Sequence, residues 1–504
     1  MWRILRKKFV YTLFAFLLGG QWAVGQGPIY KPGEYPAPRY PQVKPNYTMQ
    51  ELTAIAREVI RRPYQSAFLK AGYAIQPGHR ALIVVDSGFE ELVVEAIVRA
   101  IQEAGGRADV VTTDGGPNCM KPIADGSSEV RGILEAVPVD SEGVPLREEV
   151  GFNQKTVMNL AETGGYDILI YKSGGTHPAL AIPWQYIYWD RLDKFVTAAS
   201  FPDEVQVAID DTAWEMATQA RRYHITDPEG TDITWTIKPS YWKEAQETYK
   251  KGTGLEDFNI VHEGHISLIP LGLAVNSFLE SDAEGVIAGT INHTGAFPAV
   301  RVSISKASVG GIEGGGTYGQ RWREALAKWG DIQWPGAPGP GINKLWEVAV
   351  GTNANGIRPK DYMQHSPCGG SNSWERSRSG VIHWGMGARS DFVYDVQMPK
   401  EFATFRHEHS APTGHVHIHT YFNTVDIETI DGKKTQLINK GRLTALDDPK
   451  VRQVAAKYGD PDVLLREIWI PGIPGINMPG DYRKDYATDP VTYIRKEIQE
   501  NYKY

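Results

Sequence analysis

The chain has 504 residues, of which 41% are hydrophobic and 22% are charged, an ordinary composition for a globular protein. At about 100–200 residues per domain, this length suggests two or more structural units. The formal net charge of −7 leaves no excess of cations, so a protein that binds nucleic acid is disfavoured.

The N-terminal residues 1–25 have the layout of a secretory signal peptide. A basic start is followed by an apolar stretch at 9–18 and by small residues before Gln26, and this stretch is short for a membrane-spanning helix. We therefore expect an exported protein, periplasmic or extracellular, that is not embedded in a membrane after processing; an uncleaved anchor is the alternative. Export permits one disulfide between Cys119 and Cys368, although two cysteines exclude a disulfide-rich scaffold.

The first half of the chain is predicted to be an α/β domain with a parallel sheet, over residues 50–220, after a Pro-rich leader at 26–49. A strand, a helix and a second strand follow one another closely, which is typical of a βαβ unit. The expected elements are an amphipathic helix within 47–70, strands at 81–85, 108–112 and 166–171, and helices at 90–103 and from residue 202 onward.

The second half changes to strands and turns, and we predict a β-rich α+β metal-binding domain over residues 221–445. One hairpin is expected around Asp227-Pro228-Glu229-Gly230, where proline and glycine suit a type I turn. A second is expected at Asp431-Gly432. The remainder, 446–504, is expected to be a C-terminal extension, with its Gly- and Pro-dense stretch 471–482 an ordered surface loop or tail.

Three histidines, His415, His417 and His419, alternate along one short stretch. On an extended strand such residues share one face, so adjacent imidazoles can converge on a metal ion. The flanking β-branched and aromatic residues favour a strand. Because His407 and His409 lie just before them, a metal-sequestering histidine tract is an alternative, in which case these two histidines belong to the tract rather than to the rim of a site.

Two further stretches contain residues that suit a metal. Glu347 interrupts an apolar strand, and a carboxylate is rarely buried there without a cationic partner. His383 lies in an apolar segment flanked by glycines, which allow close approach of a ligand. One carboxylate and several imidazoles are the set from which catalytic zinc and non-haem iron sites are built.

Four motifs, in this order, resemble those of the aminopeptidase T family of metallopeptidases: ITDPEGTDITW (225–235), EVAVGTN (347–353), GVIHWGMG (380–387) and HVHIHTYF (415–422). The superfamily also contains the 2,5-dihydroxypyridine 5,6-dioxygenases. The resemblance covers roughly residues 80–445. It implies an enzyme that depends on metal, and since the family often dimerises, it is compatible with a homodimer.

Matched by position, the resemblance implies that Glu347, His383 and His417 are metal ligands. His419 stands where the family has an aspartate ligand, so it is the fourth expected ligand. His415 is expected to stand back from the metal as a catalytic residue. Two positions depart from the family: Leu273 replaces a bridging glutamate, and Ser390, the other candidate catalytic residue, replaces a tyrosine.

Because leucine cannot bridge two ions, the sequence predicts one divalent ion, Zn or Fe(II), and no organic cofactor. The foremost expectation is an exported hydrolase of aminopeptidase-like type that acts on a small-molecule or peptide substrate through one metal-activated water. The alternatives are a ring-cleaving dioxygenase that uses non-haem Fe(II), and a degenerate member that binds metal without turnover.

Overall fold

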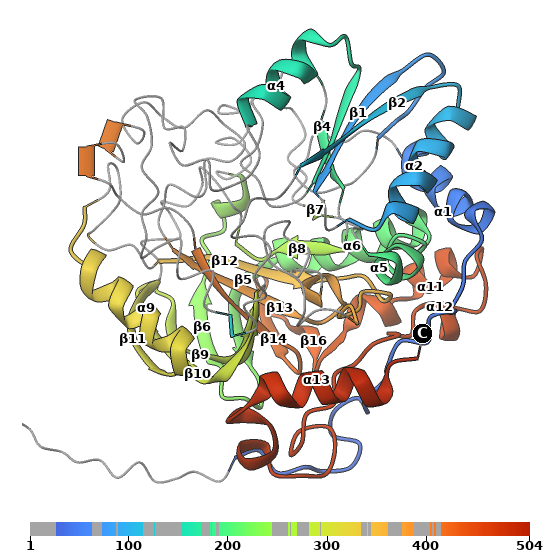
Figure 1. Cartoon of the computed structure of the whole chain (residues 1–504). Coiled ribbons are helices and arrows are strands. Elements are labelled where there is room, and N and C mark those ends of the chain that lie inside the picture. Colours follow the sequence, from blue (N-terminus) through green and yellow to red (C-terminus); the bar gives the residue numbers. More distant parts are fainter. Residues whose placement is uncertain are drawn as a thin grey trace, which may run out of the picture.

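The computed structural model describes residues 27–62, 73–86, 89–113, 125–126, 154–172, 182, 184–187, 191–243, 261–262, 264–269, 282–292, 294–333, 340, 344–360, 375–387, 404–405, 408–409 and 415–503. Over these ranges the chain forms a small parallel sheet and a large antiparallel sheet, each with helices (Figure 1). The fold is therefore of a mixed α/β class, as predicted. The domain bounds at 50, 220 and 445 stay predictions.

The small sheet has the strand order β2-β1-β3-β4, and each neighbouring pair is parallel. Its strands are β1 (Arg80–Asp86), β2 (Arg107–Thr113), β3 (Ile168–Lys172) and β4 (Trp184–Ile187). Strand β1 is joined to β2 through a helix, α2 (Glu91–Glu103), so the predicted βαβ unit is present.

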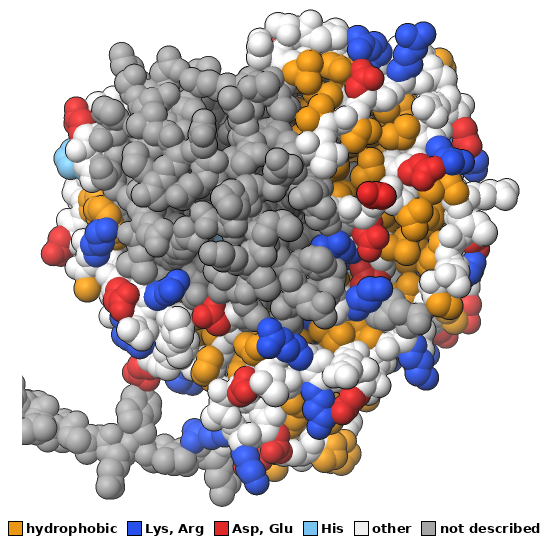
Figure 2. Space-filling model, viewed as in Figure 1, with side chains coloured by type: hydrophobic (Ala, Val, Ile, Leu, Met, Phe, Trp, Pro, Cys, Tyr) orange, Lys and Arg blue, Asp and Glu red, His pale blue; other side chains and the backbone are white. Residues whose placement is uncertain are grey.

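Helix α1 (Met49–Arg61) lies beside α2, and both contribute to one apolar core with alternate residues of β1. A capping box starts α1: the Thr48 side chain accepts from the Glu51 backbone, and the Glu51 carboxylate accepts from the Thr48 backbone. Two more helices belong to this half of the chain, α4 (Gln154–Thr163) and α5 (Leu192–Thr197). On the side of the molecule where α1 and α2 lie, Figure 2 shows a mixed surface of apolar side chains and charges of both signs.

The large sheet runs in the order β14-β13-β12-β11-β10-β9-β6-β5-β15-β16-β17, with β8 also paired to β12 and β7 to β8. The bounds are β5 (Ala220–Thr226), β6 (Asp232–Thr236), β7 (Val261–His262), β8 (His265–Ser267), β9 (Glu284–Asn292), β10 (Gly295–Ser305), β11 (Ser308–Gly314), β12 (Lys344–Gly351), β13 (Ile382–Gly387), β14 (His415–Thr420), β15 (Thr424–Thr429), β16 (Lys434–Asn439) and β17 (Arg442–Leu443). Both predicted hairpins, β5–β6 and β15–β16, are confirmed.

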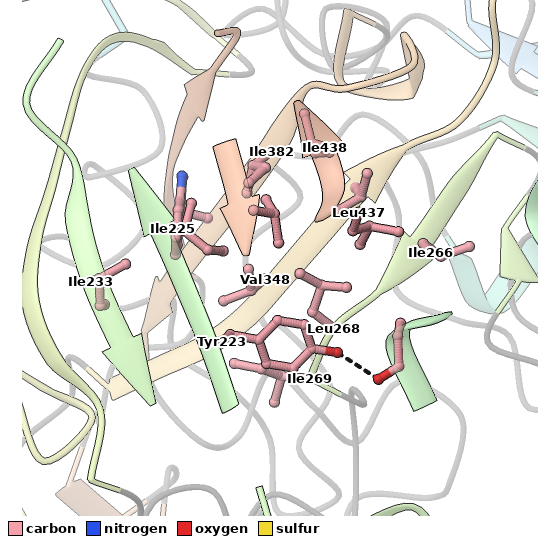
Figure 3. Close-up of a cluster of buried hydrophobic side chains, with 14 of the residues drawn as sticks. Tyr223, Ile225, Ile233, Ile266, Leu268, Ile269, Val348, Ile382, Leu437 and Ile438 are labelled. Carbon is pink, nitrogen blue, oxygen red and sulfur yellow. Dashed lines mark hydrogen bonds between the residues drawn. The ribbon is translucent and has the colours of Figure 1, made fainter. Parts of the chain in front are cut away.

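The large sheet curls so that β14, at one end of the order, lies against β9. A Cβ at Gly289 of β9 would stand 2.6 Å from the Ile418 side chain of β14, so only glycine allows the two strands to approach this closely. The curl buries the apolar residues of many strands in one core (Figure 3). The buried Tyr223 hydroxyl donates to the Ala217 carbonyl at 2.7 Å, which satisfies its polar atom.

Helices α6 (Asp203–Thr218), α9 (Gly316–Trp329) and α13 (Pro490–Asn501) pack on the large sheet. Helix α11 (Pro449–Ala455) packs on α6, and α12 (Pro461–Leu464) packs on α11. The chain also forms a 3₁₀ turn at Thr444–Asp447 and a π-helical turn at Tyr482–Ala487. The helix predicted to begin at Pro202 is α6, which has two acids in its first turn. Among the described helices, none combines the length and the apolar character that a membrane crossing needs.

The leader and the C-terminal extension lie side by side. Arg39 forms an antiparallel bridge with Ile470, and Gln42 forms a parallel bridge with Lys503. The expectation of a surface loop over 471–482 is wrong for its first part, because residues 471–477 are buried. Apolar residues such as Ile473 pack there in one cluster with buried residues of β9 and β10, which outweighs the polar preference that proline and glycine usually indicate. The predicted signal peptide and both cysteines lie outside the described residues.

Candidate metal centre

The candidate site lies on one face of three adjacent strands. Glu347 of β12 is directly opposite Gly385 of β13, and Gly385 is opposite His417 of β14, so the three residues form one row across the sheet. His383 lies two residues before Gly385 and therefore shares its face, in a second row with Ala349 and His419. The site is thus built by strand register rather than by a loop.

A β-bulge at residue 346 places Glu347 on the correct face. The register of β12 against β13 shifts between Leu345, which pairs with Met386, and Glu347, which pairs with Gly385. If the pairing continued one to one from Leu345 and Met386, Glu347 would instead pair with Trp384, whose side chain lies in the apolar core on the opposite face. Bulges commonly re-aim side chains next to functional sites.

The ligand-type atoms of Glu347, His383 and His417 all lie within 4.8 Å of one another. Glu347 Oε2 is 2.9 Å from His383 Nε2 and 3.9 Å from His417 Nε2. All three residues are buried. A carboxylate and two imidazoles gathered away from water fit a divalent cation, because the cation compensates the buried charge and accepts the nitrogen lone pairs.

Gly385 leaves the space in which these side chains meet. A Cβ at this position would lie 3.0 Å from Glu347 Cβ, 3.2 Å from Glu347 Oε2 and 3.4 Å from His417 Cδ2. Ala349 and Gly351, on the same face of β12, are also small. The floor of the site therefore consists of residues that do not compete with the ligand atoms for room.

His419 contacts the other ring nitrogen of His383, the one that does not face Glu347. Its Nε2 is 3.1 Å from His383 Nδ1, and its Nδ1 is 2.8 Å from Glu375 Oε1. Burial lowers the pKa of His419, against the opposing effect of Glu375. Burial alone would raise the pKa of Glu375, but the Arg358 guanidinium and His419 outweigh it and lower that pKa. At neutral pH, Glu375 is therefore an anion and His419 a neutral imidazole.

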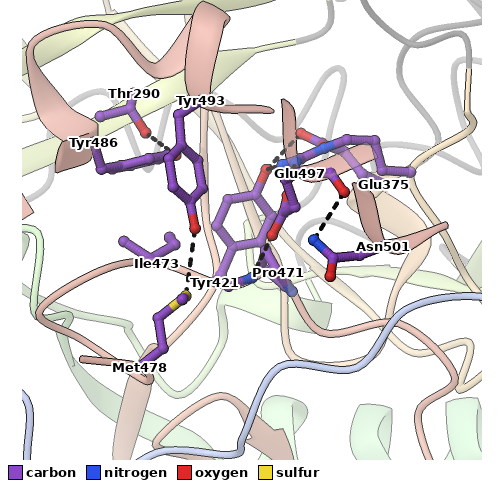
Figure 4. A network of polar contacts seen from close by, with 12 residues as sticks. Thr290, Glu375, Tyr421, Pro471, Ile473, Met478, Tyr486, Tyr493, Glu497 and Asn501 are labelled. Atoms are coloured by element: carbon purple, nitrogen blue, oxygen red, sulfur yellow. Dashed lines mark hydrogen bonds and ion pairs between the residues drawn. The ribbon is translucent and has the colours of Figure 1, made fainter. Parts of the chain in front are cut away.

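A buried polar network holds Glu375 (Figure 4). Its Oε2 accepts from Arg358 Nε at 2.9 Å, and its Oε1 accepts from the Tyr421 hydroxyl at 2.8 Å. Arg358 also contacts Glu497 of α13 at 3.3 Å. This network connects the candidate site to the C-terminal extension.

The structure thus brings together Glu347, His383 and His417, and places His419 against His383. That these four residues bind a metal stays a prediction. His415 begins β14 opposite Gly387, on the face of His417, but its side chain is outside the described residues, as are Ser390 and Leu273. His409 is exposed and stacks on Phe405 with ring centroids 4.3 Å apart, and His407 lies outside the described residues.

Two residues near the site were not predicted from the sequence. His265 of β8 is opposite Gly351, and its ring centroid is 5.6 Å from that of His383. Its sequence signal was a histidine at the start of a short apolar run, like that of His383. Glu375 had no such signal, because it lies among polar residues in SNSWERSRSG.

Comparison with known proteins gives only distant likenesses. No protein-family model matches the chain, and no curated protein sequence matches it. Among solved structures, a 2,5-dihydroxypyridine dioxygenase from Pseudomonas putida KT2440 is similar with a TM-score of 0.40 and 12% identity, over 79% of this chain and 98% of that one. AmpT from Thermus thermophilus is similar with a TM-score of 0.36 and 14% identity, over 78% and 98%.

Proposed function

We propose that this protein is a metal-dependent enzyme that binds one divalent ion through Glu347, His383 and His417. The observation that supports it is their convergence: three buried side chains from three strands present ligand atoms within 4.8 Å of one another. Catalytic zinc sites use three protein ligands of this kind and keep a further position open for water or substrate.

When bound, the ion would supply Lewis-acid chemistry, either polarising a carbonyl or lowering the pKa of a water. The residues of the chain set the charge and the surroundings of the proposed ion. Glu347 contributes one negative charge, so the ligand set leaves a net positive charge on a divalent ion. Burial of the three ligands keeps bulk water away and strengthens their electrostatic effect.

The proposed reaction is hydrolysis of a peptide or related amide outside the cytoplasm. The order of the four sequence motifs and the predicted signal peptide support this choice. Ring cleavage by a dioxygenase would use the same two imidazoles and one carboxylate with Fe(II). The identity of the preferred metal therefore separates the two reactions.

The test uses the mature protein loaded separately with Zn²⁺ or anaerobically with Fe²⁺. We expect the zinc form to hydrolyse aminoacyl anilides, and Glu347→Gln to abolish that activity. Glu313→Gln, an exposed carboxylate on β11 of the same sheet, is the matched control and should be fully active. Oxygen uptake by the iron form with dihydroxy-aromatic substrates, without hydrolysis, would replace the proposal with the dioxygenase. Metal binding without turnover of either substrate would indicate a non-catalytic binder.

A further inference from the structure

Glu375 and the two histidines of the second row form a chain of three side chains that ends on a proposed ligand. Glu375, His419 and His383 are joined by contacts of 2.8 Å and 3.1 Å. Glu375 and both histidines are buried, with no measurable exposure of any of the three. The negative charge of Glu375 at one end of this chain fixes which atom donates in each contact.

Glu375 fixes the proton on the first imidazole. A carboxylate is only an acceptor, so the ring nitrogen that faces it, His419 Nδ1, carries the hydrogen. In a neutral imidazole the other nitrogen is then an acceptor, so His419 Nε2 receives a hydrogen bond from His383 Nδ1–H. His383 consequently presents the lone pair of its Nε2 toward Glu347 Oε2, 2.9 Å away.

This arrangement matters because two acceptors at 2.9 Å repel each other unless a proton or a metal cation lies between them. The orientation that Glu375 imposes therefore leaves this position to a proton in the metal-free protein and directs the His383 lone pair toward an ion that replaces the proton. Ligating histidines characteristically donate their other N–H to an oxygen or nitrogen partner, which fixes the ring and raises its basicity.

We propose that Glu375 and His419 are positioning residues that hold His383 in its metal-ligating tautomer, with Arg358 holding Glu375 in place through an ion pair. This rests on the proposed metal site. It gives His419 a different role from the direct ligand that the sequence pattern suggests. The buried negative charge of Glu375 thereby strengthens binding of a divalent cation without contacting it.

The test compares two buried carboxylates that share Arg358. Glu375→Gln removes the charge that faces His419, whereas Glu497→Gln removes a carboxylate on the same guanidinium that makes no contact with the imidazoles. Both variants are measured in the full mature protein at about pH 8. The measurements are the Co²⁺ dissociation constant, by chelator competition, and the Co²⁺ absorption spectrum.

We expect Glu375→Gln to weaken Co²⁺ binding by about 10–100-fold while the spectrum keeps the coordination number of the wild type. Glu497→Gln should leave affinity unchanged, and His417→Ala should abolish tight binding. His419→Gln should behave like Glu375→Gln, since a positioning residue affects affinity without providing a ligand atom.

Three results would overturn the inference. Unchanged affinity in Glu375→Gln would show that the chain of contacts does not act on the ion. Equal weakening by Glu497→Gln would assign the effect to fold stability, which thermal unfolding of both variants checks. Complete loss of the metal in a folded His419→Gln variant would make His419 a ligand. If the wild type binds no divalent ion, the proposed function itself fails, and that outcome is distinct from all three.

Discussion

At the scale of single residues, the proposed metal site depends closely on Gly385. It lies between Glu347 and His417, and any side chain there would enter the space in which their ligand atoms meet. The two imidazoles of His383 and His417 are already close, with ring centroids 4.4 Å apart. Small displacements of this set therefore change the distances on which coordination depends.

Gly385→Ala should weaken metal binding by about tenfold or more, because overpacking costs about 1–3 kcal/mol and about 1.4 kcal/mol is a factor of ten. The measurement is the dissociation constant for Zn²⁺. Gly310→Ala is the control, since a Cβ at that β11 position would only approach the Ser303 hydroxyl at 3.3 Å. Equal affinity in Gly385→Ala and the wild type would show that Glu347 and His417 do not meet above this glycine.

His415 and His417 share a strand face, but we expect different effects when each is removed. His417→Ala should lose the ion, because one of the three proposed ligands is gone. His415→Ala should keep the ion and lower turnover by about 10²-fold or more, as expected for loss of a proton-transfer group. Metal content and turnover of each variant check this. Loss of the metal in His415→Ala as complete as in His417→Ala would make these two the ligand pair.

At the scale of elements, the individual strands and hairpins were largely predictable, and their register was not. Alternating apolar residues and the Asp431-Gly432 turn indicate β15 and β16 locally. The bulge that turns Glu347 toward His383 depends on pairing with β13, which is distant in sequence. The same holds for His265 and Glu375, because tertiary pairing alone brings them to the site.

The buried Glu497 of helix α13 makes the free energy of unfolding depend on pH. Burial raises the pKa of Glu497 to about 7, from 4.5, and outweighs the attraction of Arg358, which Glu375 already neutralises. The folded state therefore binds a proton that the unfolded state releases between about pH 4.5 and 7. This contribution is complete below pH 4.5 and is lost as the pH rises through about 7.

Urea unfolding at about pH 5.5 and pH 8 tests this linkage. Between these two values, the wild type should lose stability, and Glu497→Gln should lose less, because its amide stays neutral at both. A difference between the two pH values that is the same in the wild type and the variant would mean that other groups titrate instead. The comparison uses apo protein, so metal binding does not enter the result.

At the scale of the whole molecule, the class of the fold followed from the change of sequence pattern near residue 221. The curl of the large sheet could not be predicted from the sequence, because it depends on contacts such as Gly289 against Ile418 that no local pattern encodes. The packing of the leader on the C-terminal extension was also not predicted. Proline and glycine indicate turns, but they do not tell whether a turn is covered by another segment.

Export is a prediction about the whole chain that depends on residues 1–25. Their basic start and short apolar stretch should direct secretion and removal, so the mature protein should begin near Gln26. N-terminal sequencing of secreted material checks this. Mature protein that retains Met1 would count against cleavage and favour the uncleaved anchor.

The central claim is that one divalent ion lies among Glu347, His383 and His417, and anomalous diffraction from crystals of the Co²⁺-loaded protein tests it most directly. We predict a single strong anomalous peak per chain at about 2.1 Å from Glu347 Oε2, His383 Nε2 and His417 Nε2. Two adjacent peaks, a peak bonded to other residues, or no peak in protein that is saturated with Co²⁺ would contradict the account.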